Sequence, residues 1–243
     1  MNKIIAVTSG KGGTGKSTFS INLGIAAAKA DTPVLLIDMD AGMRCLDLLL
    51  GVADSVLMDV SDVTNGTDID SSVIAVPKYS GLFLLPAPAK PNTVDPDSFS
   101  LLVNEAADKY SLVIIDFPAG SDFSLYKALP KNTDFVCVCN PDPVSVRDAA
   151  LTGSSLRTMG KKGYLIINKY SYKYITNKSF RNLDDILNET GLQLLGIVPL
   201  SDRLAYAFST GDFPRRSREA KAFKRIASRI GGKLVPLPHL KKI

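Results

Sequence analysis

Eight residues near the N-terminus have the types and the spacing of a phosphate-binding loop. The segment from Gly10 to Ser17 reads GKGGTGKS and fits the pattern G-x-x-x-x-G-K-[ST]. Its glycines allow backbone N–H groups to converge on phosphate oxygens, and a helix that begins just after the loop adds positive charge at its N-terminus. In such a loop Lys16 reaches the β- and γ-phosphates and the Ser17 hydroxyl ligates Mg²⁺. The sequence therefore predicts a nucleotide site.

Three aspartates follow apolar runs that have the character of buried strands. Asp38 and Asp40 close LLIDMD, and Asp116 closes LVIID. Open parallel sheets bind ligands at the carboxyl ends of their strands, and Mg²⁺ keeps most of its waters while taking few carboxylates directly. We therefore expect these acids beside the glycine loop, around a hydrated Mg²⁺. The turn from Asp116 to Gly120, DFPAG, is typical of a switch that senses the γ-phosphate.

The segment NKYS at residues 168–171 bears on which base is bound. It resembles the guanine motif N-K-x-D, but Ser171 stands where the aspartate would accept the two guanine N–H groups. A hydrogen-bonding site that lacks one partner discriminates poorly, so guanine is disfavoured. Asn168 at a strand end is still able to hydrogen-bond adenine, which favours ATP.

Short apolar runs alternate with amphipathic segments along the chain. This order predicts the strands and helices that hold the site residues in place. Continuous hydrophobicity predicts strands covered on both faces, at residues 3–8, 33–38, 82–86, 111–116, 134–139, 164–168 and 194–199. Helices are expected between them, at residues 16–30, 97–109, 143–159, 179–190 and 217–230. The alternation predicts a single α/β domain over residues 1–243, with a mostly parallel sheet and helices on both faces.

Composition and charge narrow the class of protein. The chain is 45% hydrophobic and 22% charged, which is ordinary globular usage, and no apolar run approaches the roughly 18 residues that span a bilayer. The N-terminus leaves no room for a signal peptide, so we expect a cytoplasmic protein. Cys137 and Cys139 fit a buried strand better than a metal site.

The net charge of +5 is unevenly distributed. Residues 215–243 hold ten Lys or Arg and one acid, and the remainder of the chain is net acidic. Such asymmetry is typical of a protein with an acidic partner, either lipid or nucleic acid, although a solvated helix face explains it equally well.

Taken in order, these motifs resemble the MinD/ParA family of ATPases, whose deviant Walker A loop reads K-G-G-x-G-K-[ST]. The matching segments run from residue 3 to about residue 211 and include SGKGGTGKST (9–18), LLIDMDAGMRCLDLLLG (35–51), VIIDFPAG (113–120), NPDPVSVRDA (140–149) and LLGIVP (194–199). The extra lysine of the loop, Lys11, is specific to the family. The second and fourth of these segments are most similar to its MinD members.

The resemblance implies a role for each residue of the site. Lys11 would cross a dimer interface to the partner's ATP, as an arginine finger does, and would act in catalysis with Lys16 and Asp40, which positions the attacking water. Asp38, Asp116 and Ser17 would hold Mg²⁺ and its waters. The nucleotide contacts would come from Gly10, Lys11, Gly12, Gly13, Thr14, Gly15, Lys16, Ser17, Thr18, Asn168 and the backbone near Pro199.

The family also implies a function: an ATP-dependent homodimer that hydrolyses ATP, with a protein activator, to position a division site or a similar surface process. Such a protein is cytoplasmic or peripheral at the inner membrane surface. A ParA-type DNA partition ATPase and a flagellar or pilus-positioning ATPase of the same family are alternatives. Dethiobiotin- or cobyrinate-type synthases share the loop, but we find no second site for their substrate, and Lys11 would be unexplained.

Three departures from the family pattern stand out. Cys45 replaces the asparagine of R-N-L-D, and Leu200-Ser201 intervene before Asp202. The last predicted helix has an apolar stripe, which favours packing on the sheet over lying on a membrane. The third departure lies beyond it. The MinD members add a basic amphipathic helix that attaches to membrane, whereas residues 231–243 form a short basic tail in which Pro236 and Pro238 exclude a regular helix.

Overall fold

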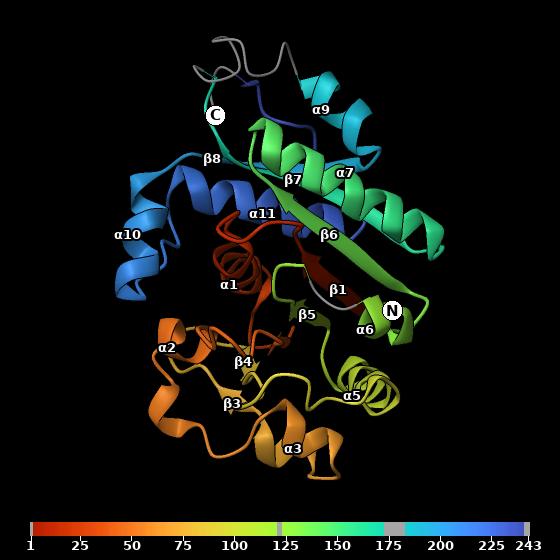
Figure 1. The fold of residues 1–243 in the computed structure, drawn as a ribbon. Helices are drawn as coiled ribbons and strands as arrows, with labels where there is room; N and C mark the ends of the chain where they lie inside the picture. Colours follow the sequence, from red (N-terminus) through yellow and green to blue (C-terminus); the bar gives the residue numbers. More distant parts are fainter. Residues whose placement is uncertain (1, 121–122, 173–182, 241–243) are drawn as a thin grey trace.

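One twisted sheet with helices on both faces organises the chain (Figure 1). The computed structural model describes residues 2–120, 123–172 and 183–240. Within them the sheet has eight strands in the order β3-β4-β2-β5-β1-β6-β7-β8. All neighbouring strands are parallel except β3 and β4, which are antiparallel. The strands are β1 (Lys3–Thr8), β2 (Val34–Asp38), β3 (Ile74–Ala75), β4 (Leu82–Leu85), β5 (Leu112–Asp116), β6 (Thr133–Cys139), β7 (Lys162–Tyr170) and β8 (Gln193–Pro199).

Helices connect these strands and cover both faces of the sheet (Figure 1). They are α1 (Lys16–Ala27), α2 (Leu46–Leu50), α3 (Val60–Thr64), α4 (Ile69–Ser72), α5 (Pro96–Lys109), α6 (Phe123–Ala128), α7 (Pro143–Thr158), α9 (Leu183–Thr190), α10 (Asp202–Thr210) and α11 (Arg218–Ile230), with a short 3₁₀ turn η1 at Ala53–Ser55. Alternate residues of one strand face opposite cores: Ile5 and Val7 pack with α1 and α11, whereas Ile4 and Ala6 pack with α5. α7 and α9 form a third core against β6 and β7.

Side-chain caps fix where several helices begin. Asp95 and Asp142 each precede a proline at the first helical position, and their carboxylates accept from backbone N–H groups of the first turn. The Ser201 and Ser217 hydroxyls do the same for α10 and α11. The chain therefore carries local start signals for α5 and α7, which connect strands, and for α10 and α11, which follow β8.

The fold confirms the predicted α/β class, and each predicted strand is found, with ends shifted by at most two residues. α1 ends at Ala27, earlier than expected, because Lys29 and Thr32 pair across a tight turn that leads into β2. Part of the predicted helix 179–190 lies outside the described residues; α9 begins at Leu183. The short helices α2, α3, α4, α6 and α10 and the edge strand β3 were not predicted.

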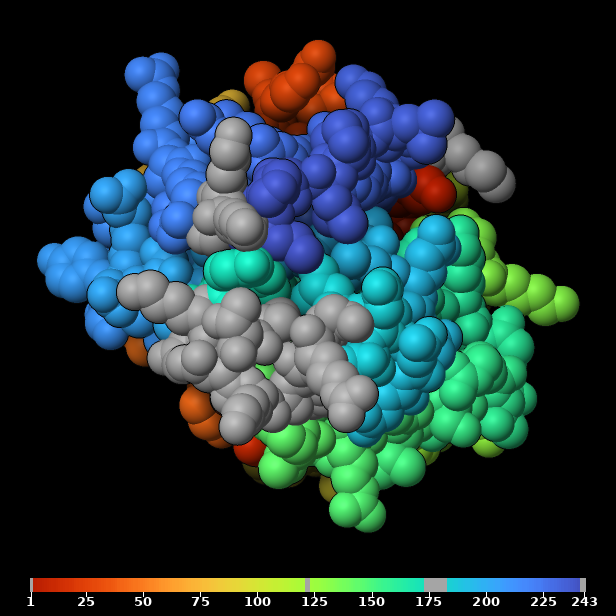
Figure 2. All heavy atoms as spheres, turned by 90° about the horizontal axis from the view of Figure 1, so that it is seen from above, coloured from red at the N-terminus to blue at the C-terminus, as the bar shows by residue number. Residues whose placement is uncertain are grey.

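The last helix packs into the core, as its pattern favoured. Phe223, Ile226 and Ile230 of α11 are buried against the sheet and α1, and the Phe223 ring lies 5.9 Å from that of Phe19. The segment that follows folds back on the body, where it forms the darkest blue surface in Figure 2. The Arg229 guanidinium holds it by donating to the carbonyls of Val235 and Pro236 at 2.8 and 3.0 Å.

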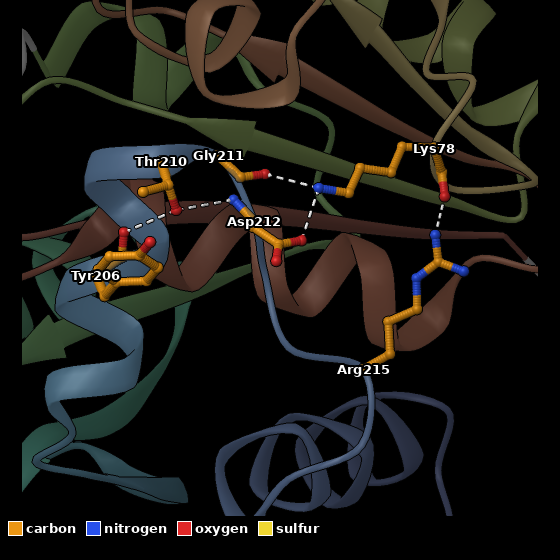
Figure 3. Close-up of polar contacts among 6 residues, drawn as sticks. All are labelled: Lys78, Tyr206, Thr210, Gly211, Asp212 and Arg215. Atoms are coloured by element: carbon orange, nitrogen blue, oxygen red, sulfur yellow. Dashed lines mark hydrogen bonds and ion pairs between the residues drawn. The ribbon is translucent and has the colours of Figure 1, made fainter.

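The linker between α10 and α11 is tied to the turn that precedes β4 (Figure 3). The Lys78 ammonium donates to the Asp212 carboxylate at 2.8 Å and to the Gly211 carbonyl at 3.3 Å. In return, the Arg215 guanidinium donates to the Lys78 carbonyl and lies 4.7 Å from the centre of the Tyr79 ring. These contacts join the turn before β4 to the segment that leads into α11.

Candidate nucleotide site

The glycine loop connects β1, a central strand, to α1, and its conformation requires glycine at two positions. Gly13 and Gly15 have φ values of 77° and 92°, in the left-handed region that side-chain-bearing residues rarely adopt. A Cβ on Gly15 would also collide with the side-chain nitrogen of Asn168. At Gly10 the crowding has another source, because a Cβ there would lie 2.6 Å from the Cβ of Asp148. Glycine at these positions and the packing around them therefore determine the shape of the loop.

Lys16 and Lys11 differ sharply in their surroundings. Lys16 is the first residue of α1 and is 8% exposed, so its side chain lies within the site. Lys11 is exposed, and within the part of the chain that the structure describes no carboxylate lies within 4.0 Å of its ammonium. The loop thus presents one buried and one outward-facing cation.

The predicted metal carboxylates meet at the ends of two adjacent strands. Asp38 and Asp116 are register partners of β2 and β5, and each is 1% exposed. Ser20 donates to Asp116 at 2.8 Å, and the backbone N–H groups of Asp40 and Leu46 donate to Asp38. The loop serine, Ser17, also hydrogen-bonds to Asp116.

Burial raises the pKa of both carboxyls, because the charged forms lose their water. The pKa of Asp38 rises to about 8, with repulsion from Asp116 as the second cause. The pKa of Asp116 rises to about 6, opposed by its bonds to Ser17 and Ser20 and by the Lys16 charge. Two buried acids that repel each other are the setting that a divalent cation would neutralise, so these residues fit Mg²⁺.

No group of three or more His, Cys, Asp or Glu side chains in the described ranges is arranged to hold a metal ion. Cys137 and Cys139, the alternative metal candidates, are buried in the core beside α7. Burial raises the pKa of the Cys139 thiol to about 12, as expected for an inert core cysteine.

Asp40 and Cys45 lie on the turn after β2. Asp40 is partly exposed and accepts from the Met43 N–H at 3.1 Å, so its carboxylate stays close to the end of the strand. Cys45 is the N-cap residue of α2, and burial, followed by repulsion from Asp38, raises the pKa of its thiol to about 11. The residue that departs from the family pattern therefore lies beside the predicted metal carboxylates.

A cavity of about 360 Å³ adjoins the loop on its other side, between the ends of β7 and β8 and helix α10. Asn168 and Pro199, both predicted to flank adenine, line it. Asn168 is buried, and its side-chain nitrogen donates to the Thr14 carbonyl at 2.7 Å. The remaining lining residues are Gly13, Gly15, Thr18, Lys169, Leu200, Ser201, Asp202, Leu204, Ala205 and Phe208.

Sequence reasoning missed the contribution of α10 and of Lys169 to this cavity. The only local signal for α10 is Ser201, an N-cap residue placed directly after a predicted strand. The predicted site residues lie in the loop and the first turn of α1, in the turn after β2, or at the ends of β2, β5, β7 and β8. The structure brings them together along the carboxyl edge of the sheet, with the acids on one side of β1 and the cavity on the other.

Comparisons with known proteins agree with this arrangement. The family model described as the CobQ/CobB/MinD/ParA nucleotide binding domain matches residues 5–214. The septum site-determining protein MinD of Thermotoga maritima is 32% identical to this chain over 98% of its length and 92% of the relative's.

Two solved structures are similar to the whole fold. MinD in the MinC:MinD cell division complex of Aquifex aeolicus superposes with a TM-score of 0.86 at 28% identity, covering 98% of this chain and 99% of that one. MinD of Pyrococcus horikoshii, solved with Mg-ADP, gives a TM-score of 0.81 at 25% identity over 95% and 96% of the two chains. The chain therefore belongs to the CobQ/CobB/MinD/ParA family of nucleotide-binding proteins, and within it to the MinD-like members.

Proposed function

We propose that this chain is a MinD-like molecular switch, which dimerises on ATP and hydrolyses it to position a division site or a similar surface process. The observation that carries the proposal is the pair of loop lysines: Lys16 is buried in the site, whereas Lys11 is exposed beside it. An exposed cation beside the site is available to the phosphates of a second subunit. The proposal also draws on the MinD relatives, one of them solved with Mg-ADP.

In this proposal each residue has a defined task. The loop N–H groups and Lys16 bind the phosphates of ATP, and Asn168 orients adenine in the adjoining cavity. Ser17, Asp38 and Asp116 would hold Mg²⁺, which when bound supplies positive charge to the phosphate oxygens. Asp40 orients the attacking water, and Lys11 of the second subunit stabilises the negative charge that develops as the terminal phosphate leaves.

A complementation experiment tests the role of Lys11 in trans. Lys11→Ala and Asp40→Ala are each expected to abolish phosphate release from ATP. Mixed in equal amounts, they are expected to recover part of the activity, because the mixed dimer holds one complete site: Asp40 from one subunit and Lys11 from the other. If the mixture stays inactive while both variants bind ATP and dimerise, Lys11 does not act across an interface.

A stimulating protein partner belongs to the same proposal. A relative from Aquifex aeolicus was solved in a MinC:MinD complex. If hydrolysis is slow and accelerates when a partner binds, the partner controls the lifetime of the ATP-bound dimer. Measuring phosphate release against protein concentration tests the intrinsic step. A rate per molecule that does not depend on concentration would contradict dimer-dependent hydrolysis.

A second candidate, a ParA-type DNA partition ATPase, is favoured by the basic residues of the C-terminal part. Arg218, Lys221, Lys224 and Arg225 of α11 are all exposed. In the described ranges no helix is long and apolar enough to cross a bilayer. Sedimentation of Asp40→Ala with anionic vesicles, in ATP or ADP and with or without duplex DNA, separates the two candidates. Pelleting with vesicles only in ATP supports the membrane-surface switch, and salt-sensitive capture by DNA supports the partition ATPase.

A further inference from the structure

Three carbonyls of the phosphate loop accept hydrogen bonds from side-chain donors. The Ser9 hydroxyl donates to the Lys11 carbonyl at 2.7 Å, and Asn168 donates to the Thr14 carbonyl at 2.7 Å. The Lys169 ammonium donates to the Gly13 carbonyl at 2.9 Å. A loop that offers its N–H groups to phosphate must turn carbonyls away from it, and donors on those carbonyls fix that orientation.

The backbone at the end of β7 is distorted where these donors lie. Lys169 has a φ of 51°, which is uncommon for a residue with a side chain. The pairing of β7 with β8 is also irregular between Ile167 and Tyr170. Asn168 and Tyr170 on either side are 7% and 1% exposed, so the conformation of Lys169 is held by buried neighbours. Such a distortion at a site is a reason to look for a functional constraint.

From these contacts we propose that Lys169 is a positioning residue, which ties the phosphate loop to the base cavity and thereby slows release of the nucleotide. It lines the cavity and at the same time bonds to Gly13, two residues after Lys11. The Lys169–Gly13 bond would therefore connect the part of the protein that binds adenine to the part that binds phosphate. The inference rests on the proposed nucleotide function and deepens it, because it assigns a role to the lysine of the NKYS segment.

The expected size of the effect follows from the type of bond. A hydrogen bond from an exposed charged donor lies at the low end of its class, so its loss should weaken nucleotide binding roughly fivefold to tenfold. Most of the change should lie in the dissociation rate, as in related complexes. The bond joins two parts of the protein itself, so its contribution is preorganisation of the loop.

Release of mant-ADP, chased with excess ADP in the presence of Mg²⁺, tests the inference. Lys169→Met keeps the alkyl chain but loses the ammonium, and release should accelerate roughly fivefold to tenfold. Lys169→Arg keeps a charged donor and should recover much of the slow release. Lys169→Gly removes the cost of a positive φ but also the donor, and should behave like Lys169→Met.

The matched control is Lys161→Met. Lys161 makes the same kind of bond, from its ammonium to the Leu129 carbonyl at 2.8 Å, but lies outside the site. This variant should release mant-ADP at the wild-type rate. Thermal unfolding of nucleotide-free Lys169→Met and Lys161→Met should show similar small losses in Tm, which separates loop positioning from general stability.

Three outcomes would overturn the inference alone, and a fourth would overturn the proposed function as well. Wild-type release from Lys169→Met would overturn the inference while leaving the proposed ATPase intact. Wild-type release from Lys169→Gly would also overturn it, because slow release of mant-ADP would then depend on the backbone conformation and not on the ammonium. Fast release from Lys161→Met as well would show that any lost lysine bond loosens the protein, which also refutes a specific role. A wild-type protein that fails to bind mant-ADP overturns both the inference and the proposed function.

Discussion

The four glycines of the phosphate loop differ in two respects: whether φ is positive and whether there is space for a Cβ atom. Gly15 has a positive φ and no space for a Cβ, because Asn168 lies against it. Gly13 has a positive φ but open space, and Gly10 has crowding from Asp148 without a positive φ. Gly12 has neither constraint. Alanine at each position therefore separates the two costs.

The structure gives an expected loss of stability for each substitution. Gly13→Ala should cost about 1–2 kcal/mol, the penalty of a left-handed conformation with a Cβ. Gly10→Ala should cost about 1–3 kcal/mol, because the atoms around Asp148 must shift to admit a methyl group. Gly15→Ala carries the conformational penalty and also displaces the Asn168 amide from the Thr14 carbonyl, so we expect about 2–4 kcal/mol in total. Gly12→Ala should stay within about 0.5 kcal/mol of wild type.

Thermal unfolding of the nucleotide-free protein in EDTA measures these differences without interference from ligand binding. For a chain of this size each kcal/mol lowers Tm by about 2–4 °C, so Gly15→Ala should melt roughly 4–16 °C below wild type. If Gly15→Ala melts with Gly12→Ala, the loop does not adopt the described conformation in the absence of nucleotide, and the argument for a preformed site fails.

Two further predictions concern the core and the thiols. Phe223→Ala should lower the free energy of unfolding by about 3–5 kcal/mol, because the ring is 1% exposed against α1; urea unfolding checks this, and the exposed Leu234→Ala should change little. Because the raised pKa of Cys45 is about 11, only about one thiol in a thousand is ionised at pH 8, so alkylation by iodoacetamide at that pH should be slow in the native protein and fast in urea. Rapid native labelling of Cys45 would contradict its burial beside Asp38.

The parts of the site that could be predicted from the sequence are those whose geometry follows from local rules. The glycine pattern fixes the loop, and apolar runs that end in aspartate place Asp38 and Asp116 at the carboxyl ends of their strands. The parallel arrangement then brings them to one edge. Their adjacency on β2 and β5 is consistent with that rule.

What was missed depends on long-range packing or on backbone angles. α10 has only nine residues, and its Leu204 and Phe208 become cavity residues through the placement of β8. Nothing in the residue type of Lys169 reveals a φ of 51°, so its bond to Gly13 was not foreseeable. The helices α2, α3 and α4, of five, five and four residues, are too short to show helical periodicity.

The two bonds from β7 to the glycine loop have a consequence for engineering this chain. A designer who wished to change its base preference would turn first to the NKYS segment, where the guanine-specific aspartate is absent. Asn168 also braces the Thr14 carbonyl and Lys169 the Gly13 carbonyl, so redesign of these two positions would disturb phosphate binding as well. Another wall of the cavity is formed by the apolar side chains of Leu204 and Phe208 on α10. Selectivity is therefore better evolved from that helix, while residues 168 and 169 are left unchanged.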